Sequence, residues 1–585
     1  MESISDTIWD VVICGTGLQQ SLLALALSRS DKKILHIDPN EYYGGAEASL
    51  SLQEADAWAS RYGGLEPSTS AVPVFSNVSV SRLESHEDGA VLASSNPKLA
   101  ASRSYALALA PQLLHSRSAL VNRLVSSQAY RQLEFLAVSS FFVVEETAGS
   151  SSPVPSLVRI PATREDVFAT TALGPREKRK LMKFLKFVIA HGSDEDAVSS
   201  LPGESSSSKN TAEWQSQATA PFGGFLQSEF DLDGRIRDYV LALTLSLDGA
   251  DTTVADGIFR LHRHITSMGA FGPGFAAVYP KWGGCSEISQ VSCRAGAVGG
   301  AVYMLGAGIR NLTQVAAEAE DPEKQDKLVD LELTNDIHVK ARLIIGGDEE
   351  LGTTPALVLS PGSSEGLRPS ASKAGTQRLS RLVAVIGASL PFLFTPPVEG
   401  APVAGGAVVA IPAGRPVLAE GLAPEHPVFA MAHSSDTGEC PLGQCVLYLA
   451  TVHTDNAKAV LNSALDTLLA AFAKRNDEAS PAVPPQQLPC LYKLYYEQLS
   501  CGGAPSSQPA ADSASSSRQQ QESVLCFTPL PADLTVPDGS LDAVRGAWMR
   551  VMGHKGVGEE AGVKSDGYMV FTDREGGDMD DDAYD

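Results

Sequence analysis

The sequence has little that would place the chain in a membrane or outside the cell. No run of apolar residues is long enough to cross a bilayer as a helix. The first ten residues, MESISDTIWD, lack the basic region and apolar core of a secretory signal. The eight cysteines are scattered, and their close pairs have neither CxxC spacing nor flanking histidines, so neither a disulfide framework nor a zinc cage is expected. These absences predict a cytoplasmic protein without a structural metal.

Basic residues are also scarce. The chain has 45 Lys and Arg against 69 Asp and Glu, which gives a net charge of −24. A field of this sign repels the phosphates of nucleic acid and gives no attraction to an anionic membrane. With 43% hydrophobic and 19% charged residues, the composition is that of a globular protein, and 585 residues suffice for two or more domains. We therefore expect cationic or apolar partners, with no nucleic acid among them.

The segment VVICGTGLQQ opens a strand, turn and helix pattern. Over residues 9–38 an apolar strand leads into a glycine turn, a helix and a second strand. Gly15, Gly17 and Asp38 stand where a dinucleotide-binding βαβ unit meets phosphates and ribose. The third glycine of that motif is Gln20 here. The motif predicts the fold, and on these residues alone an FAD-dependent oxidoreductase stays an alternative.

The residues after the second strand argue against a bound cofactor. DPNEYYGGA, residues 38–46, resembles the corresponding stretch of flavin amine oxidases, in which arginines stand before and after the double glycine. Those two positions are Tyr42 and Ala46 here, so the cations that would balance a diphosphate are missing. We therefore predict that the dinucleotide loop is vestigial, that the flavin site is lost and that the chain holds no cofactor.

Strand and helix patterns alternate along the chain in a way that indicates an insertion. Strand-like segments precede residue 157 and return after residue 275, whereas the region between them is mostly helical. The predicted fold class is α/β (α+β), a flavoprotein-like, Rossmann-like multi-sheet domain with an inserted all-helical domain. The expected boundaries are 1–157 and 248–585 for the discontinuous sheet domain and 158–247 for the helical domain. Flexible insertions are expected at 193–219, 353–377 and 505–523, and a solvated acidic tail at 573–585.

Two blocks of sequence resemble a known family. They are KKILHIDPNEYYGGAEASL (32–50) and YPKWGGCSEISQVSCRAGAVGGAVYML (279–305). Both resemble the Rab GDP dissociation inhibitor and Rab escort protein superfamily, and further similarity extends over most of residues 9–455. In that superfamily the flavoprotein-like fold binds no flavin and holds GDP-bound Rab GTPases, which is what the resemblance implies for this chain.

The resemblance also implies which residues face the GTPase. Tyr43, Glu287, Gln290 and Arg294 would belong to the Rab-binding platform. An acid and a base seven residues apart, together with a tyrosine, suit a polar, charge-paired interface. Without the resemblance, Glu287 and Arg294 would be interpreted as an ordinary surface pair on a helix.

The two branches of the superfamily differ in one short stretch. Escort proteins present unprenylated Rab to the α/β heterodimer of Rab geranylgeranyltransferase, which they contact with a phenylalanine and an arginine eleven positions later. DVFATTALGPREKR supplies Phe168 and Arg179 at that spacing, whereas dissociation inhibitors lack the phenylalanine. The long insertions also favour the escort branch. A dissociation inhibitor that recycles prenylated Rab stays the nearest alternative, and Phe168 is equally well explained as a helix-core residue.

The helical region would shelter the geranylgeranyl lipid of the Rab. The residues expected to line its groove are Leu181, Leu185, Val188, Leu241 and Leu245, although plain helix packing explains each of them as well. No catalytic nucleophile, acid–base pair or metal cage emerges from the sequence. We therefore expect a non-catalytic accessory subunit of the geranylgeranyltransferase that meets membranes only transiently, through its Rab.

Overall fold

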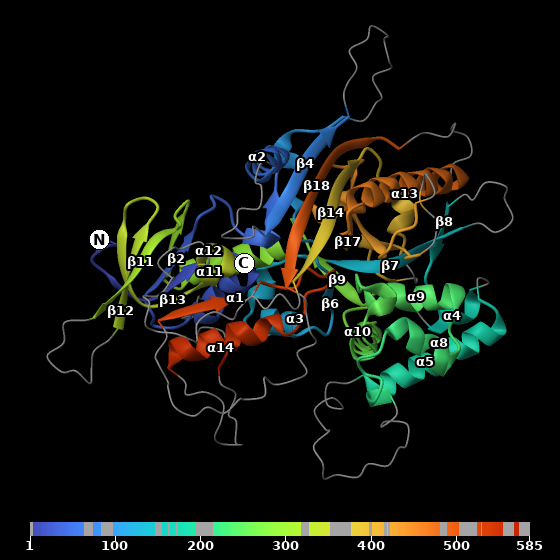
Figure 1. Ribbon diagram of the computed structural model, residues 1–585, viewed down its shortest axis with the longest axis horizontal. Helices are drawn as coiled ribbons and strands as arrows, with labels where there is room; N and C mark the ends of the chain where they lie inside the picture. The colour runs from blue at the N-terminus through green and yellow to red at the C-terminus, as the bar shows by residue number, and fades with distance from the viewer. Residues whose placement is uncertain are drawn as a thin grey trace, which may run out of the picture.

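Two large β-sheets lie side by side in the computed structural model, and a cluster of helices adjoins the second sheet (Figure 1). In Figure 1 a seven-stranded sheet lies at the left, a ten-stranded sheet in the upper centre and the helical cluster at the lower right. The structure describes residues 4–63, 74–83, 98–146, 155–161, 164–170, 173–192, 214–316, 327–351, 376–396, 400–414, 418, 422–479, 488–501, 523–527, 529–553 and 567–572.

The seven-stranded sheet contains the predicted dinucleotide-type unit. Its order is β10-β2-β1-β13-β12-β11, with β19 beside β13. The strands are β1 (Ile8–Cys14), β2 (Ile34–Asp38), β10 (Val302–Leu305), β11 (Ile309–Ala316), β12 (Lys327–Leu333), β13 (His338–Gly347) and β19 (Val524–Phe527). β1 runs parallel to β2 and to β13, and helix α1 (Leu18–Leu27) connects β1 with β2, so the predicted βαβ unit is confirmed.

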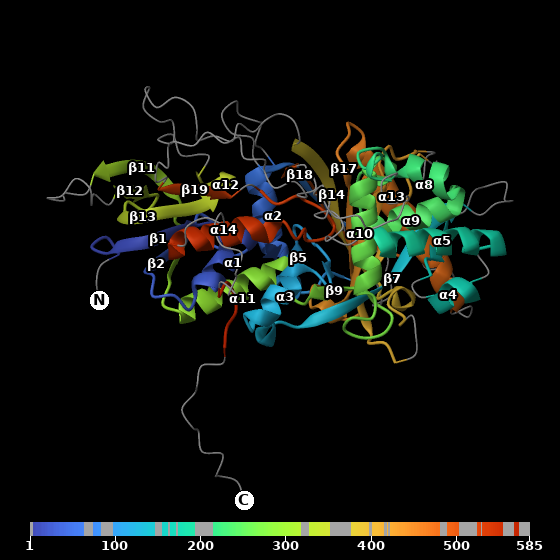
Figure 2. The same ribbon diagram turned by 90° about the horizontal axis from the view of Figure 1, so that it is seen from below.

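β1 is apolar from Val11 to Cys14, where both of its faces are buried. Val11 and Ile13 pack with α1 against helices α11 (Cys285–Val298) and α14 (Ser540–Met552). Val12 faces the opposite side, where it shares a core with apolar residues of β2, β12 and β13. Figure 2 shows α1, α11 and α14 together beside β1 and β13. α11 is thereby fixed on a rigid sheet.

The ten-stranded sheet has the order β4-β18-β14-β17-β16-β15-β7-β9-β6, with β8 beside β7. The strands are β4 (Phe75–Arg82), β6 (Leu114–His115), β7 (Phe135–Glu146), β8 (Pro155–Arg159), β9 (Ala277–Pro280), β14 (Thr376–Ile386), β15 (Ala404–Ile411), β16 (Val428–Ser434), β17 (Cys445–Val452) and β18 (Cys490–Cys501). Helix α13 (Ala457–Ala479) packs Leu461 and Phe472 on one face of this sheet, against Ala384 and Val409 among others. The opposite face shares its core with the helical cluster.

The helical cluster has an aromatic core. It consists of α4 (Arg164–Ala169), α5 (Pro175–His191), α8 (Phe222–Phe230), α9 (Gly234–Thr244) and α10 (Val254–Ser267). Phe184 of α5 contacts Phe222 and Phe230, with ring centroids 6.2 and 5.1 Å apart. α10 packs against α5, α8 and α9, so the cluster extends to Ser267 instead of ending at residue 247.

The remaining described elements are short. They are α2 (Leu52–Tyr62), α3 (Ala119–Ser126), α12 (Asp348–Leu351) and the pair of strands β3 (Ser49–Leu50) and β5 (Leu107–Ala108), with 3₁₀ turns that include η1 (Gly45–Glu47) and η9 (Ser435–Thr437). Within the described ranges, no helix is both long and apolar enough to span a membrane. The predicted insertions at 193–219, 353–377 and 505–523 lie outside the described residues except for 214–219, 376–377 and 523, and the tail at 573–585 lies wholly outside them.

Candidate functional site

The glycine turn after β1 is closed by its own neighbours. Gly15 has a φ of +88°, which glycine tolerates, and its amide donates to the carbonyl of Ile37 at 2.8 Å. The amide and hydroxyl of Thr16 both donate to Oδ2 of Asp38, at 2.7 and 2.6 Å. Burial raises the pKa of Asp38, and these hydrogen bonds oppose that shift. Asp38 therefore holds the turn together from within the protein.

Side chains also fill the space at the N-terminus of α1. Oε2 of Glu47 accepts the amide N–H of Leu18 at 3.1 Å, and burial raises the pKa of Glu47 to about 7. A Cβ on Gly17 would lie 3.0 Å from Oε1 of Gln20, and one on Gly15 would collide with the carboxylate of Glu350. In a dinucleotide-binding fold this helix end and these glycines receive the pyrophosphate. Here the helix end and the two glycines are next to the carboxylates of Glu47 and Glu350 and the side-chain amide of Gln20.

α11 brings three of the predicted platform residues onto one face. Glu287, Gln290 and Arg294 follow at spacings of three and four, while Ile288 and Val291 on the other face pack against α1. Gln290 and Arg294 are exposed and Glu287 is half-buried. Burial raises the pKa of Glu287, and the charge of Arg294 acts against that rise.

The loop that carries Tyr43 lies against the first turn of α11. The amide of Gly44 donates to Oγ1 of Thr16 at 3.1 Å, and a Cβ on Gly44 would stand 3.3 Å from Oγ of Ser286. Partial burial raises the pKa of Tyr43, and the nearby thiol of Cys293 on α11 adds to the rise. The structure thus brings Tyr43 to the helix that carries the other three platform residues, and their role stays a prediction.

A buried polar network, absent from the sequence predictions, holds the turn before α11. Glu439 is fully buried and accepts three hydrogen bonds, from Oη of Tyr279 at 2.7 Å, Nδ1 of His433 at 2.7 Å and Oη of Tyr448 at 2.9 Å. Beyond Tyr279 the chain turns at Gly284, where a Cβ would lie 2.7 Å from the tyrosine hydroxyl. These partners lie 6, 9 and 160 positions from Glu439 in the chain and match no motif, so the sequence pattern did not reveal the network.

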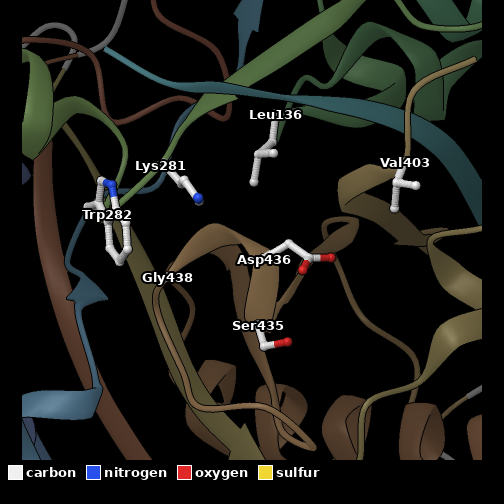
Figure 3. A pocket seen from close by; sticks show the side chains of 7 residues that line it. All are labelled: Leu136, Lys281, Trp282, Val403, Ser435, Asp436 and Gly438. Atoms are coloured by element: carbon white, nitrogen blue, oxygen red, sulfur yellow. The ribbon is translucent and has the colours of Figure 1, made fainter. Parts of the chain in front are cut away.

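A pocket opens beside the same turn (Figure 3). It has a volume of about 420 Å³ and is lined by Leu136, Lys281, Trp282, Val403, Ser435, Asp436 and Gly438. Trp282 is 48% exposed, and its amide donates to the carbonyl of Thr437 at 2.8 Å. Figure 3 shows the side chains of Lys281 and Asp436 on opposite sides of the hollow. Trp282 lies inside the second family-like block, but its exposure could not be predicted from the sequence, so the block itself was the only signal.

Phe168 and Arg179 are both at the surface of the helical cluster. Phe168 stands near the end of α4 with 57% of its surface exposed, so it is not a helix-core residue. Its carbonyl accepts a hydrogen bond from Nζ of Lys178 at 2.7 Å, which ties the end of α4 to the second turn of α5. Arg179 is exposed on the following position of α5. The chain thus places Phe168 and Arg179, both exposed, near the junction of α4 and α5, and their role in transferase binding stays a prediction.

The predicted groove residues lie in packed core. Leu181, Val188 and Leu245 are buried within the cluster core, and Leu185 and Leu241 are partly buried against it. The structure therefore supports the alternative of helix packing for each of them in the described conformation. A lipid groove lined by these residues stays a prediction and requires the helices to separate.

A sheet with a glycine turn, a second large sheet and an attached helical cluster define a flavoprotein-like, Rossmann-like architecture. In this chain its phosphate position is filled by side chains. The family profile described as GDP dissociation inhibitor matches residues 5–70 and 77–320, more than half of the chain. The chain therefore belongs to the GDP dissociation inhibitor family.

Named relatives agree with this membership, and one solved structure shares the fold. A Saccharomyces cerevisiae protein named Rab proteins geranylgeranyltransferase component A is 29% identical over 297 residues, which are 51% of this chain and 43% of that protein. Rab escort protein 1 of Arabidopsis thaliana is 31% identical over 327 residues, 51% of this chain and 54% of that protein. The chain thus spans about half the length of these relatives. The crystal structure of a Rab GDI from Plasmodium falciparum matches 94% of this chain and 98% of its own, with a TM-score of 0.54 and 16% identity, which supports the fold.

Proposed function

We propose that this protein is a Rab escort protein. It binds GDP-bound, unprenylated Rab GTPases, presents them to the α/β heterodimer of Rab geranylgeranyltransferase and shelters the prenylated product until a membrane receives it. The observation that carries the proposal is the exposed Phe168 next to the cationic start of α5, in a family whose members named escort protein or component A resemble this chain.

The GTPase would be held by the face of α11 and the loop of Tyr43. Glu287 and Arg294 offer opposite charges on one helix face, and Tyr43 adds an amphipathic ring, a combination typical of protein interfaces. The sheet beneath α11 and the Glu439 network keep this surface rigid before the partner arrives, which reduces the entropy lost on binding.

The lipid and the transferase would be handled by the helical cluster. A geranylgeranyl chain has about twenty carbons, and at ~0.8 kcal/mol per buried methylene its transfer from water is worth well over ~10 kcal/mol. Such a chain needs an apolar shelter, and the aromatic core around Phe184 offers one if α5 moves away from α8 and α9. Phe168 and Arg179 lie on the outer side, where a docked transferase would find them.

The chemistry belongs to the transferase in this proposal, and the protein acts without a cofactor. The residues at the N-terminus of α1 do not fit a flavin dinucleotide, because the carboxylates of Glu47 and Glu350 stand where a pyrophosphate would add further negative charge. An oxidoreductase is therefore disfavoured. A dissociation inhibitor is the second candidate, and it is favoured by the family profile but not by the exposed Phe168.

The experiment that tests the proposal is reconstituted geranylgeranylation of a GDP-loaded Rab by the purified transferase, with and without this protein. An escort makes prenylation proceed when it is added. A dissociation inhibitor leaves unprenylated Rab unmodified but extracts prenylated Rab from vesicles, so a negative prenylation result together with extraction would select the second candidate.

A further inference from the structure

Helix α5 concentrates positive charge in an otherwise acidic protein. Six of its seventeen residues are Lys or Arg, and Glu177 is its one acidic residue. The whole chain has a net charge of −24. α5 therefore forms a basic patch on a protein whose total charge is negative, and the net charge alone does not reveal this patch.

Four of these six side chains form a cationic stripe. The stripe consists of Arg176, Arg179, Lys183 and Lys186, all exposed. Their spacings of three, four and three residues put them on one face of the helix, opposite the buried face with Phe184 and Val188. The other two cations serve the fold, since Lys178 caps the carbonyl of Phe168 and Lys180 pairs with Asp231 at 2.5 Å.

The cationic stripe is unfavourable for the isolated helix. Like charges three or four residues apart repel each other and destabilise a helix. Lys183 lies with its ammonium 5.5 Å from the ring centre of Phe230, a contact that leaves its charge at the surface. A surface that weakens its own helix in this way is explained when a partner of opposite charge gains from it.

We propose that the cationic stripe extends the transferase docking surface beyond Phe168 and Arg179, and that the transferase presents an acidic surface to it. This inference rests on the proposed function. Exposed apolar side chains flank the stripe, Phe168 (57% exposed) near its start and Ile189 (54% exposed) at its end, an arrangement that suits a protein interface with apolar anchors and charged contacts.

A protein partner is favoured over an anionic membrane by the surroundings of the stripe. Asp231 pairs with Lys180 at the edge of the helix, and Asp233 follows in an exposed position. A flat anionic bilayer that approached the stripe would also approach these carboxylates and would be repelled by them and by the net negative charge of the chain. A protein groove can contact the stripe alone and avoid this repulsion.

The test measures the dissociation constant of the full-length protein for the purified transferase heterodimer over a series of NaCl concentrations. The variant is Lys183→Glu with Lys186→Glu, and the matched control, Lys340→Glu with Lys474→Glu, makes the same charge change at exposed lysines on β13 and α13. We expect the variant to bind about tenfold or more weakly at low salt and to lose most of its salt dependence, with the control within about twofold of wild type. Unchanged binding of GDP-loaded Rab confirms that the variant is folded.

Equal transferase affinity of variant and wild type would overturn the inference. A second arm uses vesicles of phosphatidylcholine with and without phosphatidylserine. If the variant loses binding to phosphatidylserine vesicles while keeping transferase affinity, the stripe is a membrane surface and the inference is wrong. A wild-type protein that binds no transferase at any salt concentration would instead refute the proposed function.

Discussion

Single residues decide what the inherited glycine turn can hold. Glu47 stands at the N-terminus of α1, and burial raises its pKa from 4.5 to about 7. Because the folded state holds this proton more tightly than the unfolded chain, ionising Glu47 lowers the free energy of unfolding. This decrease in the free energy of unfolding is absent below the pKa of Glu47 in the unfolded chain, about 4.5. It grows as the pH rises and is complete above the pKa of Glu47 in the folded protein, about 7.

We predict that Glu47→Gln stabilises the protein at alkaline pH. Glutamine keeps an acceptor for the amide of Leu18 but carries no charge, so the variant escapes the cost of a buried carboxylate. The free energy of unfolding should exceed that of wild type by up to about 3 kcal/mol near pH 8 and by little near pH 4.5. Denaturant titrations of both proteins at the two pH values check this, and a difference that does not change with pH would contradict it.

Glu439 is predicted to set the position of the turn before α11. In Glu439→Gln the carboxylate that accepts hydrogen bonds from His433 and Tyr279 becomes an amide whose nitrogen cannot accept, so stability should fall by up to about 3 kcal/mol and the Rab affinity of the folded protein should fall too. The matched control is Glu497→Gln, which breaks the ion pair with Arg378 on β14 and β18 at a similar cost. Affinity for GDP-loaded Rab should be unchanged in that control. Equal affinity losses in both variants would assign Glu439 a general stabilising role.

At the scale of elements, the face of α11 is the surface that the proposal assigns to the GTPase. Arg294→Glu places a second carboxylate near Glu287 and removes the opposite charge, so we predict that the affinity for GDP-loaded Rab falls about tenfold or more. Arg103→Glu, at an exposed arginine of a 3₁₀ turn, makes the same charge change elsewhere. Titration of labelled Rab with each variant measures the effect. A comparable loss in the control would mean that net charge, and not this face, governs binding.

The end of α4 is the element that separates an escort from a dissociation inhibitor. Truncating an aromatic hot spot costs about 2 kcal/mol or more, so Phe168→Ala should bind the transferase about thirtyfold more weakly while keeping its Rab affinity. Phe271→Ala removes a ring that is 56% exposed just beyond α10 and is the matched control. Prenylation at limiting amounts of the protein gives the functional readout. A wild-type rate with Phe168→Ala would remove this residue from the docking surface.

For the whole molecule, local sequence patterns predict where helices and strands lie, but they predict poorly which strands pair and which helices pack together. The apolar run of β1, the glycine turn and the strand that ends at Asp38 were predictable, since periodicity and turn chemistry act within a few residues. The parallel pairing of β7 with β15, some 270 residues apart, was not. The helical cluster was expected to end at residue 247, but α10 joins it through side chains that only the folded chain brings together.

In the candidate site, too, local features were predictable from the sequence and long-range contacts were not. The family resemblance singles out Glu287, Gln290 and Arg294, and their spacing of three and four residues puts them on one face of α11. Neither could reveal Glu439, because its partners come from β9, β16 and β17. The lipid-groove residues stay a prediction, because apolar helical spacing is the same for a packed core and for a lipid site. In the described structure these residues are packed in core.

Whether this dinucleotide-type fold still binds a cofactor can be tested with flavin. We predict that the purified protein lacks the visible absorption bands of flavin and that excess FAD leaves its melting temperature unchanged. A ligand at about 100 times its Kd stabilises a folded protein by about 2.7 kcal/mol, an effect large enough to be seen. The physical reason is the contact of Glu47 with the N-terminus of α1 and of Glu350 with Gly15, which would repel a diphosphate and occupy its place. If FAD raised the melting temperature of wild type but not of a Gly17→Leu variant, the turn would still be a working dinucleotide site, and the reuse of this fold as a protein carrier would have to be abandoned.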